Sequence, residues 1–151
     1  MARKLAEARK LLRGVWLLAV LVVIVGSLLP SDSGAMRAIN RLPLSDKAEH
    51  SAAYAFLAFV PAIHERRRRV LAFTVGAVLL GVALEFAQLW SGWRDFEIAD
   101  MVADAVGAAA GLALGWMFRV YTVAQPATVS ARYETAERTR TVSARRHAGQ
   151  E

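Results

Sequence analysis

Hydrophobic residues gather in four stretches of the chain, and polar or turn-forming residues separate these stretches. The apolar runs cover 14–29, 51–63, 70–89 and 98–121. A helix that crosses a bilayer needs about 20 mostly apolar residues, so the second run must borrow Ala48 and His64 at its ends. Pro30 and Gly34 in the first connection are typical of a turn. The pattern predicts an all-α integral membrane protein, a four-helix bundle with antiparallel neighbours.

The basic residues are divided unevenly between the two predicted sides of the membrane. Of 19 Lys and Arg residues, 15 lie before the first run, in the connection with Arg66 to Arg69, or from Arg119 onward. Segments rich in Lys and Arg stay in the cytoplasm. The sequence therefore predicts that both termini and the arginine run lie in the cytoplasm. The predicted parts of the chain are a basic N-terminus over 1–13, a membrane domain over 14–121 and a disordered tail over 122–151.

Aromatic residues agree with this orientation. Trp and Tyr favour the interfacial zones of a bilayer. Trp16, Trp116 and Tyr121 fall at the predicted inner side, whereas Trp90 and Trp93 fall at the outer side. The aromatic pattern thus predicts two interfacial belts.

Composition narrows the classes of function. The chain of 151 residues has no cysteine, which excludes thiol catalysis and a disulfide framework. The net charge of +6 comes from cations that flank apolar runs; membrane lipids are therefore the expected partners, and no nucleic acid is predicted. A cleaved signal peptide ending near Ser33 to Ala35 is an alternative for the first run, but its long basic region favours a retained helix.

Ionisable and amide side chains recur near the predicted outer ends of three helices. They are Asp46, His50 and Tyr54 at spacings of four in the second helix, Glu85 and Gln88 at the end of the third, and Asp100 and Asp104 at the start of the fourth. Such residues are costly inside a membrane. Their similar depth on three helices predicts that they surround one pocket in the outer leaflet. The alternative is an ion-pair network that only fixes helix packing.

The predicted pocket has candidates for proton transfer and for ligand binding. His50 is the expected proton relay, with Asp46 one turn away to orient it, and Glu85 and Asp100 are further proton-handling candidates. Ligand contacts are expected from Lys47, Tyr54, Gln88, Arg94 and Asp104. Of these, Lys47 and Arg94 would bind an anion. A divalent cation is not favoured, because no compact motif such as HExxH is present, and whether any reaction occurs is open.

Small residues form a stripe on the fourth helix. Gly107, Gly111 and Gly115 recur at spacings of four, which allows another helix to approach the backbone closely. The stripe predicts helix packing. The sequence leaves open whether the partner is a helix of the same chain or of a second copy in a homo-oligomer.

Together these motifs resemble the VanZ-like family of small membrane proteins, which is named for a component of glycopeptide-resistance clusters linked to teicoplanin resistance. The resemblance is carried by SLLPSD, DKAEHSAAYAFLAF, EFAQ and RDFEIADMVADAVGAAAG. Where the family usually has Asn, this chain has Asp104, which adds a negative charge beside Asp100. The resemblance implies a cell-envelope protein and does not supply a reaction.

The first functional hypothesis is a multi-pass protein of the bacterial inner membrane. Its outer-leaflet pocket would bind or modify an anionic envelope molecule, such as a lipid-linked precursor, and thereby affect glycopeptide sensitivity. The rival hypothesis is a non-enzymatic scaffold or partner protein in which the polar set is structural. A proton-coupled transporter is a weaker alternative, because four spans without an internal repeat make a small scaffold.

Overall fold

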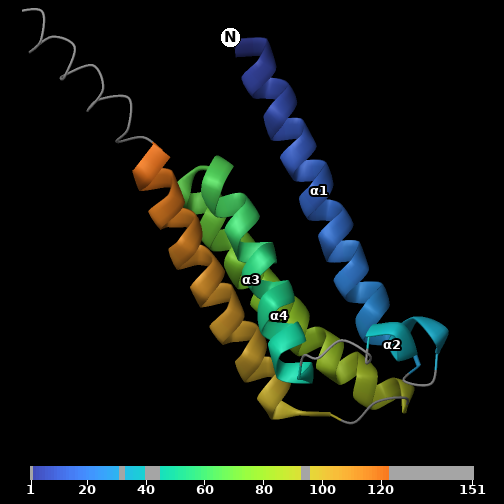
Figure 1. Cartoon of the computed structure of the whole chain (residues 1–151). Helices are drawn as coiled ribbons and strands as arrows, with labels where there is room; N and C mark the ends of the chain where they lie inside the picture. The colour runs from blue at the N-terminus through green and yellow to red at the C-terminus, as the bar shows by residue number, and fades with distance from the viewer. Residues whose placement is uncertain (1, 31–32, 40–44, 93–95, 123–151) are drawn as a thin grey trace, which may run out of the picture. The chain divides into compact units, whose positions relative to one another are not determined.

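The computed structural model describes residues 2–30, 33–39, 45–92 and 96–122, and the secondary structure of these residues is entirely helical (Figure 1). The labelled helices are α1 (Ala2–Leu28), α2 (Gly34–Ile39), α3 (Asp46–His64) and α4 (Arg67–Ser91). A further helix, here called the C-terminal helix, covers Ile98–Thr122. The prediction of an all-α protein is confirmed. The short α2 was not predicted, and the predicted tail over 122–151 lies outside the described residues except for Thr122.

Three of the described helices are long and apolar enough to cross a membrane. They cover Ala6–Leu28, Arg67–Ser91 and Ile98–Thr122. The remaining long helix, α3, does not qualify, because Asp46, Lys47 and Glu49 occupy part of its 19 residues and shorten its apolar segment. Large apolar side chains such as Leu79 and Val106 are about 60% exposed, as expected for surfaces that face lipid. The helices indicate a multi-pass membrane protein.

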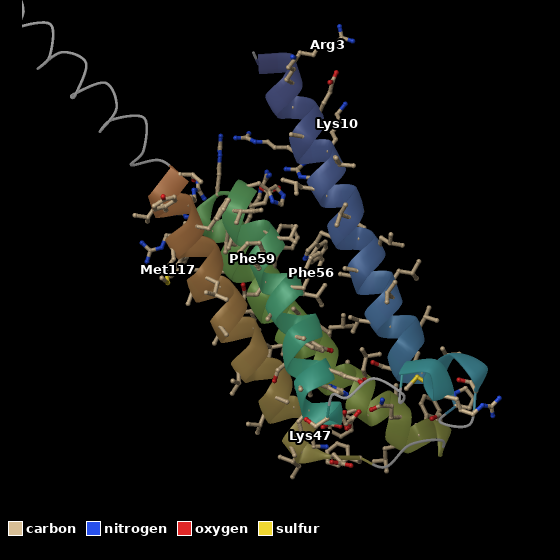
Figure 2. The ribbon with its side chains drawn as sticks, in the orientation of Figure 1. Arg3, Lys10, Lys47, Phe56, Phe59 and Met117 are labelled. Atoms are coloured by element: carbon tan, nitrogen blue, oxygen red, sulfur yellow. The ribbon has the colours of Figure 1, made fainter. Side chains whose placement is uncertain are left out.

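Contacts between helix ends show that successive long helices within Met1–Trp116 alternate in direction. At one end, Lys47 at the start of α3 pairs with Glu97 just before the C-terminal helix. At the other end, Arg13 of α1 pairs with Glu65 just after α3 at 2.6 Å. We call the end with Lys47 and Glu97 the acidic end and the end with Arg13 and Glu65 the basic end. Figure 2 shows Lys47 at one end and Arg3 and Lys10 toward the opposite end.

Local signals explain where α3 and α4 begin and end. The side chain of Ser45 accepts a hydrogen bond from the Ala48 N–H, and Asp46 and Glu49 place negative charge in the first turn, where the helix dipole favours it. At its C-terminus α4 is closed by Gly92, whose φ of 69° suits a residue without Cβ. These caps fix the two helix ends that form the acidic end.

The glycine stripe of the C-terminal helix packs on α3 of the same chain. A Cβ at Gly107 would overlap the backbone of Ser51, and a Cβ at Gly111 would overlap the backbone of Ala55. At Gly115 a Cβ would come within 3.1 Å of the Phe59 carbonyl oxygen. The close helix approach therefore occurs inside one chain, and this stripe needs no second copy to be buried.

Trp16, which was expected at the inner interface of the membrane, also joins helices. Its indole lies 4.8 Å from the ring of Phe73 on α4, measured between centroids, and its N–H donates to the Leu57 carbonyl on α3 at 2.8 Å. Trp16 thus packs α1 against two other helices instead of serving only as an interfacial residue. Trp90, which was expected at the outer interface, is 93% exposed.

Candidate functional site

Polar side chains from α3, α4 and the C-terminal helix meet at the acidic end. Four of them are almost completely buried, with exposed fractions of 2% for Glu85, 3% for Gln88, 5% for Asp100 and 1% for Asp104. Buried ionised groups require partners, because desolvation costs several kcal/mol for each. The structure therefore brings together the residues that the sequence placed at matched depths. Arg94, a predicted anion ligand, lies outside the described residues.

His50 and Asp104 form a close pair across two helices. The Nδ1 atom of His50 lies 2.9 Å from Oδ1 of Asp104, whereas its Nε2 atom lies 3.8 Å from Oδ2 of Asp100. Asp46 was expected to orient His50; in the structure Asp104 holds Nδ1 from another helix, and donor atoms of Asp46 and His50 lie within 4.8 Å of each other. Because Gly107 packs directly on the backbone of Ser51, it brings Asp104, one turn earlier on the same helix, against His50.

Lys47 is surrounded by carboxylates. Its ammonium group pairs with Glu97 and lies 2.6 Å from Asp100 and 3.5 Å from Asp46. Lys47 was predicted to bind an anionic ligand. Its three carboxylate neighbours already satisfy its positive charge, so the geometry gives it the role of joining α3 to the C-terminal helix.

Glu85 and Gln88 bind main-chain groups at the ends of neighbouring helices. The Glu85 carboxylate accepts a hydrogen bond of 3.0 Å from the Glu97 N–H, at the start of the C-terminal helix. The Gln88 amide donates a bond of 2.9 Å to the Ser27 carbonyl, in the last turn of α1. Main-chain groups at helix ends lack partners within their own helix. Both side chains of α4 thus satisfy such groups, a role the sequence did not suggest.

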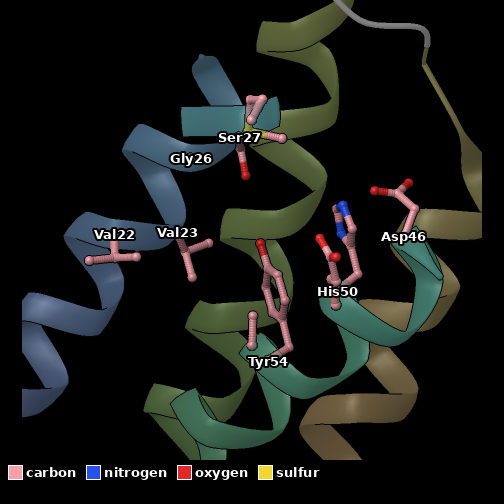
Figure 3. A pocket seen from close by; sticks show the side chains of 10 residues that line it. Val22, Val23, Gly26, Ser27, Asp46, His50 and Tyr54 are labelled. Atoms are coloured by element: carbon pink, nitrogen blue, oxygen red, sulfur yellow. The ribbon is translucent and has the colours of Figure 1, made fainter. Parts of the chain in front are cut away.

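A cavity of about 180 Å³ lies beside the His50–Asp104 pair, between α1, α2 and α3. The ionisable residues of its lining, Asp46, Glu49 and His50, come from α3. Val22 and Val23 provide an apolar wall from α1. Figure 3 shows His50 and Tyr54 on α3 and Val23 on the facing helix. The cavity combines an apolar side with an acidic side, which is the character expected of a site for an amphipathic group.

Tyr54 lines the cavity and also belongs to the buried core of the helix bundle. It is 2% exposed, and its hydroxyl lies 3.0 Å from where a Cβ of Gly81 would be. A Cβ at Gly81 would also overlap the Asp104 carboxylate. Glycine at position 81 therefore lets Tyr54 and Asp104 approach α4, and substitution there would disturb the support of His50.

Three side chains could supply metal ligands, but a lysine already lies beside two of them. Donor atoms of Asp46, His50 and Asp100 all lie within 4.8 Å of one another. Two carboxylates and an imidazole fit several divalent metals. The ammonium group of Lys47, however, already provides positive charge to Asp46 and Asp100. A resident metal is therefore not needed to balance this group.

The basic end contains a second buried polar cluster that the sequence analysis missed. Glu65, which is 5% exposed, pairs with Arg13 at 2.6 Å, with Arg69 at 3.4 Å and with His64 at 3.6 Å. Glu65 stands directly before four arginines, and this position in the sequence already indicated an ion pair. Sequence spacing could not show that Arg13, 52 residues earlier, would reach it.

In comparisons of the chain with family models, with curated proteins and with solved structures, no match was found. The similarity to the VanZ-like family therefore stays a prediction that rests on the motifs quoted above. The fold and the site show a class of protein and not a family. The chain is a helical protein of multi-pass membrane type with a polar cluster at one end of its bundle.

Proposed function

We propose that this protein lies in the bacterial inner membrane with its acidic end outward and both termini in the cytoplasm. We further propose that the cavity between α1, α2 and α3 binds the polar end of an amphipathic envelope molecule, and that His50 exchanges a proton with it. The VanZ-like motifs and the uneven distribution of Lys and Arg support the location.

The observation that carries the proposal is the position of His50. Its ring lines the cavity while Asp104, 1% exposed, holds Nδ1 at 2.9 Å. A carboxylate at Nδ1 fixes the ring and its tautomer, which leaves Nε2 to accept or donate a proton. This arrangement supports acid–base chemistry or proton-dependent binding at Nε2.

The contacts of Lys47 change the expected nature of the bound molecule. Anion binding was expected to depend on Lys47 and Arg94, but Lys47 is held by Glu97, Asp100 and Asp46. An anionic group would have to compete with these carboxylates. The lining of the cavity therefore supports an envelope molecule whose bound end is not an anion.

The proposal is tested by complementing a deletion strain with single variants at equal membrane level. His50→Gln keeps a side chain that can hydrogen bond to Asp104 but cannot exchange a proton near neutral pH. We expect His50→Gln and Asp104→Asn to fail to restore growth and sensitivity to envelope antibiotics, teicoplanin among them. Glu7→Gln, at an exposed ion pair with Arg3 on α1, is the matched control and should complement fully.

Normal complementation by His50→Gln would overturn the proton-transfer role. A specific observation then favours the second candidate function, a membrane scaffold: Glu85 and Gln88 bind main-chain groups of other helices. In a scaffold, variants would fail only when the protein also disappears from the membrane.

A further inference from the structure

We propose that the cavity between α1, α2 and α3 takes a primary ammonium group carried by a membrane lipid. This inference rests on the proposed function and names the chemical class of the molecule bound there. It depends on three independent features of the cavity: the charge of its lining, the position of Lys47 and the origin of its apolar wall.

The charged residues of the lining are acidic. Asp46 and Glu49 line the cavity together with His50, and no lysine or arginine of the described residues does so. Glu49 makes no ion pair within the described part of the chain. A cationic group in the cavity would gain charge-assisted hydrogen bonds from carboxylates, whereas a phosphate would be repelled.

The nearest lysine, Lys47, contacts only one of the two carboxylates that line the cavity. The ammonium group of Lys47 pairs with Glu97 and Asp100 at the C-terminal helix and lies 3.5 Å from Asp46. Lys47 thus shares its charge among Asp46, Glu97 and Asp100, and no ion pair joins it to Glu49 within the described residues. The carboxylates that line the cavity therefore include Glu49, which Lys47 does not neutralise in this structure.

The apolar wall suggests that the ammonium group belongs to a lipid. Val22 and Val23 line the cavity from α1, and Val22 is itself 61% exposed on a helix apolar enough to span the membrane. The cavity volume of about 180 Å³ is well above the roughly 10 to 15 Å³ that a single water molecule needs. This space suits the amine end of a head group, with the phosphate outside the acidic lining and the attached chains along α1 in the bilayer.

Gly26 offers a way to fill the cavity without disturbing the helix. It lines the cavity, and a Cβ added there would meet no atom within 4 Å. Gly14, on the same helix, also has nothing within 4 Å and does not line the cavity. Gly26→Leu and Gly14→Leu therefore form a matched pair, since both replace a glycine of α1 and only one blocks the site.

The test measures lipids retained by the purified full-length protein in native mass spectrometry. The protein is incubated with equal amounts of phosphatidylethanolamine, its N-acetylated form and phosphatidylglycerol, all with the same acyl chains. Loss of a charge-assisted bond changes affinity about tenfold, so we expect phosphatidylethanolamine to be retained about tenfold over the N-acetylated lipid. Glu49→Gln and Gly26→Leu should remove this preference, and Gly14→Leu should keep it.

Equal retention of the three lipids, or an unchanged preference in Gly26→Leu, would overturn the inference. Retention that requires added Ca²⁺ and ignores acetylation would also overturn it, by assigning the cavity to a metal ion. The thermal midpoints of Glu49→Gln and Gly26→Leu, measured in the same detergent, show whether each variant is folded. A wild-type protein that needs His50 for complementation but does not prefer the amine would refute this inference alone and leave the proposed function standing.

Discussion

The indole N–H of Trp16 donates a hydrogen bond of 2.8 Å to the main-chain carbonyl of Leu57. In a regular helix this carbonyl would bind the N–H of residue 61, but that residue is Pro61, which has no N–H. The side chain of α1 thus satisfies a carbonyl that the proline of α3 leaves without its helical donor. In an apolar environment such an unsatisfied carbonyl is costly.

This relationship predicts coupling between Trp16 and Pro61. Trp16→Phe keeps the ring but removes the donor, and we expect it to lower the free energy of unfolding by about 1 to 3 kcal/mol. In the Pro61→Ala background, where residue 61 has an N–H for Leu57, the same change should cost less. Reversible unfolding in detergent micelles measures this double-mutant cycle. Trp90→Phe is the control, and additive effects of Trp16→Phe and Pro61→Ala would refute the coupling.

The glycine stripe predicts a large loss of stability when either of two of its glycines is replaced, in contrast to a glycine of α4 that has no close neighbour. Gly107→Ala and Gly111→Ala would push a methyl group into the backbone of α3, and overpacking of this kind typically costs about 1 to 3 kcal/mol. Gly76→Ala meets nothing within 4 Å and should be neutral or stabilising, because alanine favours a helix. Thermal midpoints in one detergent compare the three. Equal midpoints would contradict the close approach of the C-terminal helix to α3.

Glu65 predicts a pH dependence of stability. Burial alone would raise the pKa of this carboxyl, but the hydrogen bonds and charges of Arg13 and Arg69 hold it below its ordinary value of 4.5. Since the folded-state pKa is the lower one, the ion pairs stabilise the fold above pH 4.5. That contribution is lost as the pH falls below 4.5 and through the folded-state pKa.

The measurement compares wild type with Glu65→Gln from pH 7 to pH 3. At pH 7 the variant should be less stable by about 1 to 3 kcal/mol, because Arg13 and Arg69 lose a charged acceptor. The difference should shrink as the pH falls. Glu7→Gln, at an exposed pair, should show little difference at any pH, and a constant deficit for Glu65→Gln would argue against the ion-pair explanation.

Glu85 distinguishes a structural role from a proton-handling role. The contact to the Glu97 N–H needs only an acceptor, which Glu85→Gln keeps and Glu85→Leu removes. We expect Glu85→Gln to fold and complement normally and Glu85→Leu to lose stability by about 1 to 3 kcal/mol. Complementation at matched membrane level, together with thermal midpoints, checks this. A stable Glu85→Gln protein that does not complement would return Glu85 to the proton-handling residues of the site.

The proposed orientation is open to direct chemical labelling, because the chain has no cysteine. Ser91 lies at the end of α4 nearest Gln88, and Arg68 lies in its first turn. If the acidic end faces outward, a membrane-impermeant maleimide should label Ser91→Cys in intact cells and Arg68→Cys only after lysis. The opposite pattern would reverse the orientation and place the cavity on the cytoplasmic side.

The hydrophobic pattern by itself determined that the chain is helical and membrane-spanning in character. It also identified the polar residues that meet at the acidic end, since an ionisable residue in an apolar run stands out. The prediction of a membrane span at 51–63 had the least support from the pattern. The charged first turn of α3 leaves an apolar segment that is too short to qualify as a span.

Only the tertiary structure decided which polar groups are partners. Spacing along one helix suggested Asp46 as the group that orients His50, yet Asp104 holds it from another helix. Likewise, no periodicity could show that Trp16 supplies the donor missing at Pro61. The physical reason is that periodicity reports which face of a helix a residue occupies. Close helix contacts, such as the one that Gly107 permits, decide which atoms of two faces come within hydrogen-bonding distance.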